Sequence, residues 1–240
     1  MKLLALDTAT EWCSAALKID GEIRDRELMA ERGHGGHVLT LIDELLAEAG
    51  LALTGLDAIA FGRGPGAFTG LRLAASITQG LAYAAGLQVI AVSDLRAMAQ
   101  QAMALPPLPA RVLVCLDARM AEVYWAGFSS AVGCARAATP EMVARPEHML
   151  EAAAAWLNAE PADPPARVCG AGSGFAAYPT LAAFGARLHT VLPAIRPRAR
   201  EIAVLAAHDG LACSVAPEQA LPVYVRDNVA VVPAAFPGSL

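Results

Sequence analysis

The sequence contains few cysteines, and their spacing does not suit disulfide bonds or metal binding. There are five among 240 residues, an odd number, at positions 13, 115, 134, 169 and 213, with no C-x-x-C pair. Disulfide-rich domains and zinc sites place cysteines in even-numbered or closely paired sets. We therefore expect all five to be reduced and structural.

Charge is also scarce, and positive charge does not dominate. Charged residues make up 17% of the chain and the formal net charge is -5. A domain that holds nucleic acid by itself normally carries a basic face, because its cations displace the counterions condensed on the phosphates. A nucleic-acid role for this chain would therefore need additional components.

No long hydrophobic run opens the chain. The apolar stretch 3–6 ends at Asp7, which is too short for the hydrophobic region of a signal peptide and far too short for a membrane span. We expect a cytoplasmic protein with no membrane partner.

Hydrophobic residues, by contrast, make up 56% of the sequence. Disorder is therefore not expected, and the length gives room for one large domain or two lobes of roughly one hundred residues each. The apolar excess must serve helix packing or a partner interface. We expect an oligomer or a subunit of a complex.

Hydrophobic periodicity divides the first half into a β-β-β-α-β-α-β-α series. Short apolar runs predict strands at 3–6, 13–19, 22–30, 58–61 and 88–92. Apolar residues at helical spacing predict helices over 37–49 and 67–85, each ending at a glycine, and a third helix follows the capping residue Ser93. This order is typical of a mixed sheet flanked by helices.

The proline-rich run 105–109 interrupts this series, and the same pattern then restarts. Aligning 4–7 with 114–117 places an aspartate, Asp7 or Asp117, at the end of each first strand. This predicts a duplicated unit and two α/β lobes, 1–105 and 110–199. A last helix at about 200–213 could cross back to the first lobe, and 228–240 is predicted to be a tail.

A glycine-rich segment, 61–73, joins a predicted strand to a predicted helix. Glycines stand at 62, 64, 66 and 70 around Pro65. Three interpretations remain open: phosphate binding at the helix N-terminus, a tight turn with positive φ angles, or backbone contact with another chain. The P-loop lysine and the G-x-G-x-x-G spacing are absent, so we favour contact with another chain.

The helix after this segment carries small residues that would let a second helix approach closely. The neighbouring helix over 37–49 has a broad apolar stripe. We therefore predict a partner interface on these two helices, and expect Ala74→Arg or Ala75→Arg to block binding in a folded protein. The candidate interface residues are Val38, Leu41, Ile42, Leu45, Phe68, Leu71, Ala74, Ala75, Thr78 and Ala82.

Other residues are weaker candidates for chemistry. His34 and His37 could bind metal with a third ligand or could cap a helix. Asp7 and Asp117, with Gly172 in a second glycine-rich turn, could contact a metal-bound nucleotide, or the acids could cap their turns. No G-x-S-x-G elbow is present, and we predict no catalytic residue and no metal site.

The densest basic run lies over 196–200, where three arginines precede the last predicted helix. With Arg187 they could contribute to a nucleic-acid surface, or they could form a solvated helix end.

Four segments, 4–10, 61–72, 117–124 and 222–227, resemble the TsaB (formerly YeaZ) family, and 61–72 is the most specific of them. The duplicated strand-turn-strand ending in aspartate, the proline break and the glycines at 170–174 also resemble the two-lobed actin/hexokinase/Hsp70-like (ASKHA) architecture. The resemblance implies an α/β fold of two such lobes.

The family resemblance further implies a non-catalytic scaffold of the machinery that adds a threonylcarbamoyl group to N6 of adenosine 37 in tRNAs reading ANN codons. Such proteins are thought to bind and activate TsaD, a catalytic paralogue that holds ATP and a metal, and the ATPase TsaE joins them. The resemblance implies self-association when TsaD is absent, no cofactor of the chain's own, and contact with tRNA only in the complex.

This chain departs from the catalytic paralogue in two respects. His34 and His37 are three residues apart, whereas the metal-binding histidines of TsaD are four apart, and the turns after Asp7 and Asp117 lack a phosphate-wrapping glycine. The alternative is an enzyme, either an actin-fold ATPase or kinase or a glycoprotease-like hydrolase.

Overall fold

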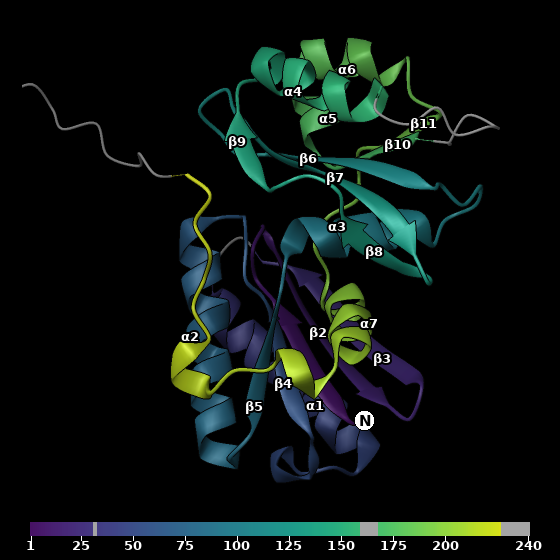
Figure 1. The fold of residues 1–240 in the computed structure, drawn as a ribbon. Coiled ribbons are helices and arrows are strands. Elements are labelled where there is room, and N and C mark those ends of the chain that lie inside the picture. Colours follow the sequence, from purple (N-terminus) through teal and green to yellow (C-terminus); the bar gives the residue numbers. More distant parts are fainter. Residues whose placement is uncertain (31–32, 159–167, 227–240) are drawn as a thin grey trace, which may run out of the picture.

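The structure, a computed structural model, describes residues 1–30, 33–158 and 168–226. It contains two mixed β-sheets, one above the other in Figure 1. The first sheet has the order β3-β2-β1-β4-β5 and consists of β1 (Leu3–Asp7), β2 (Trp12–Ile19), β3 (Glu22–Met29), β4 (Ala58–Gly62) and β5 (Gln88–Val92).

The second sheet repeats this plan. Its order is β11-β10-β6-β7-β8, formed by β6 (Arg111–Asp117), β7 (Val123–Ala131), β8 (Cys134–Ala137), β10 (Val168–Ala171) and β11 (Thr190–Leu192), while β9 (Met142–Ala144) pairs separately with β7. In each sheet three antiparallel strands precede two parallel ones. The predicted duplicated, two-lobed α/β fold is confirmed.

Helices cover the outer face of each sheet. Helices α1 (His34–Ala49) and α2 (Phe68–Ala85) pack on the first sheet, and α4 (Pro146–Asn158), α5 (Gly174–Ala177) and α6 (Pro179–Gly185) pack on the second. Helices α1 and α2 end at Gly50 and Gly86, both in the left-handed conformation that glycine adopts without strain. Helix α1 begins three residues earlier than predicted.

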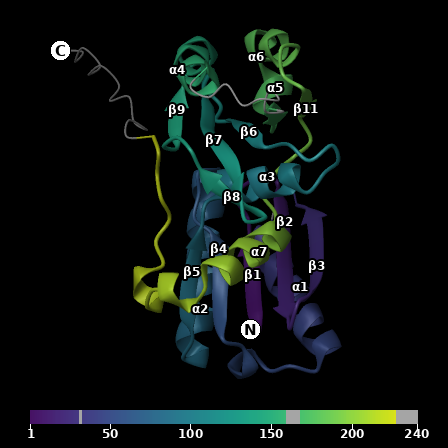
Figure 2. The same ribbon diagram turned by 45° about the vertical axis from the view of Figure 1, so that its right-hand side comes forward.

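The remaining two helices lie on the inner faces (Figure 2). Helix α3 (Asp94–Met103) follows the first lobe in sequence but packs against the second sheet, through residues such as Met98 and Ala102. Helix α7 (Ala199–Asp209) packs against the first sheet through Ile202, Ala203 and Ala206. Arg96 of α3 and Asp209 of α7 form an ion pair at 2.6 Å, so the two helices connect the lobes.

Short 3-10 helices and an extended segment complete the fold. They are η1 (Leu53–Gly55), η2 (Leu211–Cys213) and η3 (Pro217–Gln219). Gly210 separates α7 from η2, so the helix predicted over 200–213 ends at Asp209. Residues 220–226 then run beside α2 towards the second lobe (Figure 1). Among the described helices, none has the length and hydropathy needed to cross a membrane.

Candidate functional site

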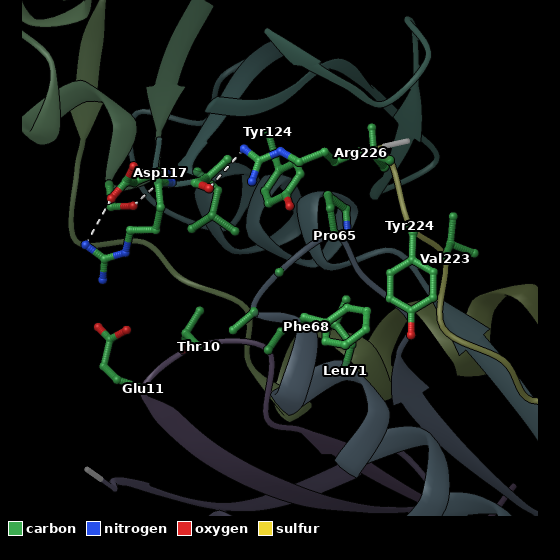
Figure 3. Close-up of a pocket in the computed structure, with 18 residues that line it drawn as sticks. Thr10, Glu11, Pro65, Phe68, Leu71, Asp117, Tyr124, Val223, Tyr224 and Arg226 are labelled. Carbon is green, nitrogen blue, oxygen red and sulfur yellow. Dashed lines mark hydrogen bonds and ion pairs between the residues drawn. The ribbon is translucent and has the colours of Figure 1, made fainter. Parts of the chain in front are cut away.

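A pocket of about 650 Å³ lies between the lobes. The turn after β1, the N-terminus of α2, the β6–β7 turn and the C-terminal segment all contribute to it (Figure 3). Its wall is apolar at one side and polar at the other. The residues that line it are Ala9, Thr10, Glu11, Pro65, Gly66, Ala67, Phe68, Leu71, Leu116, Asp117, Ala118, Arg119, Tyr124, Ser173, Val223, Tyr224, Val225 and Arg226.

The glycine-rich turn between β4 and α2 packs closely on the turn after β1. Ala67 N–H donates to Ala9 O at 2.8 Å, and Thr8 Oγ1 donates to Gly70 O at 2.7 Å. A Cβ at Gly66 would press on Ala9, and one at Gly70 would collide with Thr8 O. The close backbone approach that we assigned to another chain is therefore made to this chain's own residues.

Asp7 does not face the pocket, contrary to its candidate role as a nucleotide contact. Its side chain is 1% exposed and meets Asp94, the first residue of α3, above Gly62. The outer oxygens accept from backbone amides: Asp7 Oδ1 from Ala9 N–H and Asp94 Oδ2 from Gly64 N–H. The remaining oxygens face each other without another partner. This buried Asp7–Asp94 pair joins β1, the β4–α2 turn and α3.

The environment of this pair favours the protonated form. Burial raises the pKa of Asp7 to about 6, partly offset by hydrogen bonds from Asp94 and the Ala9 backbone. Burial, and then the charge of Asp7, raise the pKa of Asp94 well above its usual range, although Gly64 N–H and the Arg63 charge oppose this. Two carboxyl groups in contact cannot both ionise cheaply, so we infer that they share a proton near neutral pH.

Asp117 lines the pocket, but its carboxylate is engaged. Tyr178 Oη and Arg119 N–H donate to Asp117 Oδ1 at 2.7 and 2.9 Å, and the Arg119 guanidinium lies 3.4 Å from Oδ2. Burial, and then the bond to Asp117, raise the pKa of Tyr178 to about 12, so its hydroxyl remains a donor. Asp117 is therefore a turn-organising acid.

The two aspartates also point to non-equivalent faces of their sheets. Leu3 and Ala5 of β1 face the inner helix α7, and Asp7 follows them in the two-residue alternation of the strand. Leu113 and Cys115 face the outer helices, and Asp117 follows them towards Tyr178. The alignment of 4–7 with 114–117 therefore pairs residues that face opposite sides of their sheets, and the two carboxyl groups do not point to a common site.

Gly172, the third nucleotide candidate, is not among the pocket-lining residues. With φ of 107° it packs against Cys115 O and Met98, and a Cβ there would collide with both. Its role in the structure is close packing between β6 and α3.

The C-terminal segment is the part of the site that the sequence analysis missed. Val223 N–H donates to Arg63 O at 2.7 Å in the first lobe, while Arg226 bonds to the Glu122 carboxylate at 2.6 Å and to Ala118 O at 3.1 Å in the second. The segment therefore links both lobes along the pocket. The one signal for it was the family-like segment 222–227, to which we gave no role.

Nine of the ten predicted interface residues are buried inside the protomer, which corrects their assignment as a contact surface. Val38, Leu41, Ile42, Leu45, Leu71, Ala74, Ala75, Thr78 and Ala82 are between 0 and 6% exposed. The apolar stripes of α1 and α2 face the first sheet, since the sheet needs that cover. Phe68 alone is exposed, at 46%. An arginine at Ala74 or Ala75 would therefore disrupt the fold.

The outer side of α2 is the part left open. Thr69, Arg72, Ser76, Gly80 and Tyr83 form an exposed stripe at helical spacing. A Cβ at Gly80 would meet no atom within 4 Å. Ser76 and Gly80 are small, and a second helix can approach closely where small residues lie.

His34 and the three arginines of the run 196–200 have partners within the chain, while Arg187 is exposed beside the Phe184 ring. A His34 ring nitrogen lies 3.3 Å from Thr10 O, and the described residues contain no set of three or more His, Cys, Asp or Glu side chains arranged to hold a metal. Arg196, Arg198 and Arg200 pair with Glu27, Glu201 and Asp25. The pairs to Glu27 and Asp25 of β3 hold the start of α7 on the first lobe, and the pair to Glu201 lies at the N-terminus of α7 itself. Together they leave little free charge on this run for a nucleic-acid surface.

Known proteins are similar to this chain in sequence and fold. A family model described as TsaD, tRNA N6-adenosine threonylcarbamoyltransferase, matches residues 28–234. The tRNA threonylcarbamoyladenosine biosynthesis protein TsaB of Escherichia coli (strain K12) is 38% identical over 244 residues, 96% of each chain. The protein of that name from Haemophilus influenzae is 52% identical over 125 residues, 52% of each chain.

A solved structure, YeaZ from Pseudomonas aeruginosa, superposes with a TM-score of 0.78 at 38% identity and covers 93% of this chain and 99% of its own. The family-model match, over residues 28–234, includes the glycine-rich turn, the second lobe and the C-terminal segment. The chain therefore belongs to the TsaB (YeaZ) family, within the actin-like superfamily of two-lobed proteins.

Proposed function

We propose that the chain is a non-catalytic, cytoplasmic scaffold of tRNA threonylcarbamoyladenosine biosynthesis. In this role it binds and activates a TsaD-type paralogue, which holds ATP and the metal and transfers the threonylcarbamoyl group to N6 of adenosine 37 in ANN-decoding tRNAs. A TsaE-type ATPase joins the pair, and tRNA is met only through the complex. Membership of a family whose curated members carry the biosynthesis name supports the pathway.

The open stripe on α2 is the observation that carries the scaffold role. Ser76 and Gly80 are exposed at its centre, and nothing in the described chain fills the space next to Gly80. A partner helix packed there would bury the stripe at close range. When the paralogue is absent, a second copy of the chain would use the same surface.

A substitution that fills this space tests the proposal. Gly80→Arg or Ser76→Arg should leave the thermal unfolding of the chain nearly unchanged and abolish co-elution with the TsaD-type protein of the same organism. Ala152→Arg, at an exposed alanine of α4 in the other lobe, is the matched control and should co-elute normally. Normal co-elution of Gly80→Arg would sink the proposed surface.

The interlobe pocket favours a second candidate, a nucleotide-binding enzyme, because its volume is in the range of small-molecule sites. The disposition of the two candidate acids supports the scaffold, since Asp7 is buried against Asp94 away from the pocket and Asp117 is bound by Tyr178. Calorimetric titration of the isolated chain with ATP and Mg²⁺ distinguishes the two. Micromolar binding would favour the enzyme.

A further inference from the structure

Arg72 is held in a fixed position on the exposed stripe of α2. Its guanidinium carbon lies 3.9 Å from the centre of the Phe68 ring, and its Nε donates to Tyr224 Oη at 3.0 Å. The two rings are 5.3 Å apart and lie together beside the pocket (Figure 3). Tyr224 comes from the C-terminal segment, so two distant parts of the chain orient this one side chain.

The charge of Arg72 is not satisfied within the described chain. No ion pair among the described residues includes Arg72, whereas Arg63, Arg96 and Arg226 all pair with carboxylates. Its recorded bond uses Nε and leaves both Nη groups without a protein acceptor among the described residues. Arg72 is also the one charged residue of α2.

The surroundings of Arg72 suit a protein partner. Phe68, Val223 and Tyr224 are 46, 40 and 43% exposed, so an apolar surface rims the cation. Arginine and aromatic residues are enriched in binding hot spots. A guanidinium that is already stacked on a ring loses little further conformational freedom when its Nη groups bind a carboxylate. Arg72 also lies between Thr69 and Ser76, within the stripe that the proposed partner would cover.

We propose that the Phe68–Arg72–Tyr224 cluster is a docking point for an aspartate or glutamate side chain of the TsaD-type partner. This inference rests on the proposed function. The contact adds direction to an otherwise uncharged helix surface, because one carboxylate must meet one guanidinium when the helices pack. Charge pairs of this kind fix the register of an interface.

Carbodiimide coupling tests the chemistry directly, because it joins an amine to a carboxylate that lies next to it. In the complex of Arg72→Lys with the TsaD-type protein, we expect a cross-link between the peptide that contains position 72 and an acidic residue of the partner. The control is Arg187→Lys, an exposed site beside the Phe184 ring of the second lobe, which should give no such product. A complex that forms without coupling at position 72 would overturn the proposal.

Affinity measurements separate this inference from the proposed function. Arg72→Gln should weaken binding about tenfold or more at low salt, as expected for a hot-spot arginine, and less at high salt because ions screen the pair. Arg187→Gln should bind as the natural chain does. If Gly80→Arg abolishes binding while Arg72→Gln has no effect, the carboxylate contact is wrong and the scaffold role stands. If the natural chain itself does not bind, the proposed function fails.

Discussion

The buried Asp7–Asp94 pair gives a prediction whose sign and size follow from the structure. Asp7→Asn should stabilise the protein more at pH 8 than at pH 5. The asparagine oxygen can still accept from Ala9 N–H, and its amide can donate to Asp94, which then has no second carboxyl beside it. In the natural chain the two carboxyl groups share a proton, and holding that proton at high pH costs folding free energy.

The size can be worked from Asp7. Its pKa rises from 3.8 to about 6 in the folded state, so the folded chain retains a proton that the unfolded chain releases above pH 4 or so. Through Asp7, stability is therefore lost as pH rises from roughly 4 to roughly 6, and the Asp7 contribution to this loss is nearly complete above that range. At about 1.4 kcal/mol per pKa unit the total is about 3 kcal/mol, of which about half develops between pH 5 and pH 8.

Thermal unfolding followed by circular dichroism measures this effect. The difference in Tm between Asp7→Asn and the natural chain should grow by roughly 3 to 6 °C from pH 5 to pH 8 for a chain of this size. Asp43→Asn, which removes an exposed carboxylate of α1, controls for the change in net charge and should show no such growth. A Tm difference that is the same at both pH values would refute the shared proton.

Other substitutions test the packing of the site. Gly70→Ala should destabilise the chain in urea unfolding, because the collision with Thr8 O outweighs the roughly 1 kcal/mol that alanine gains in a helix. Gly80→Ala on the same helix should be neutral or stabilising. Equal effects of the two substitutions would contradict the close packing at Gly70. The side chain of Ala74 is fully buried, so Ala74→Arg should lower Tm sharply or prevent folding, while Gly80→Arg should do neither. A stably folded Ala74→Arg protein would contradict the packing of α2 on the sheet. Arg226→Ala should speed hydrogen exchange of residues 221–225, since it removes the bonds to Glu122 and Ala118; unchanged exchange would mean that the first-lobe contacts alone hold the segment. Calorimetric titration with ATP and Mg²⁺, in a buffer without phosphate, should show no micromolar binding to the isolated chain. Measurable binding would favour the enzyme.

The order of helices and strands could be predicted from the sequence because it is a local property. The two-residue and helical periods of apolar residues located the five strands of the first sheet and the helices α1, α2 and α3, and Gly50 and Gly86 marked the ends of α1 and α2. The restart after the proline run predicted the second sheet, which repeats the topology of the first. Helix starts were less certain, as α1 showed, because no side chain caps its first turn.

The direction in which each stripe faces could not be predicted, because an apolar face looks the same whether a sheet or another protein covers it. Only the tertiary structure showed that Leu41 and Ala75 pack on the first sheet and that the outer stripe of α2 is open.

By itself, then, the sequence determined the two-lobed α/β fold, through hydrophobic spacing and duplication, and its family resemblance was confirmed. The tertiary structure decided which groups meet: Asp94 reaches Asp7 from 87 residues away, and Tyr224 reaches Arg72 from the far end of the chain. Such contacts depend on how the lobes and the C-terminal segment pack, and no local pattern in the chain records them. The glycines of the 61–73 segment illustrate this division. Their number predicted a close backbone approach, but the sequence did not show that the approaching backbone belongs to the same chain.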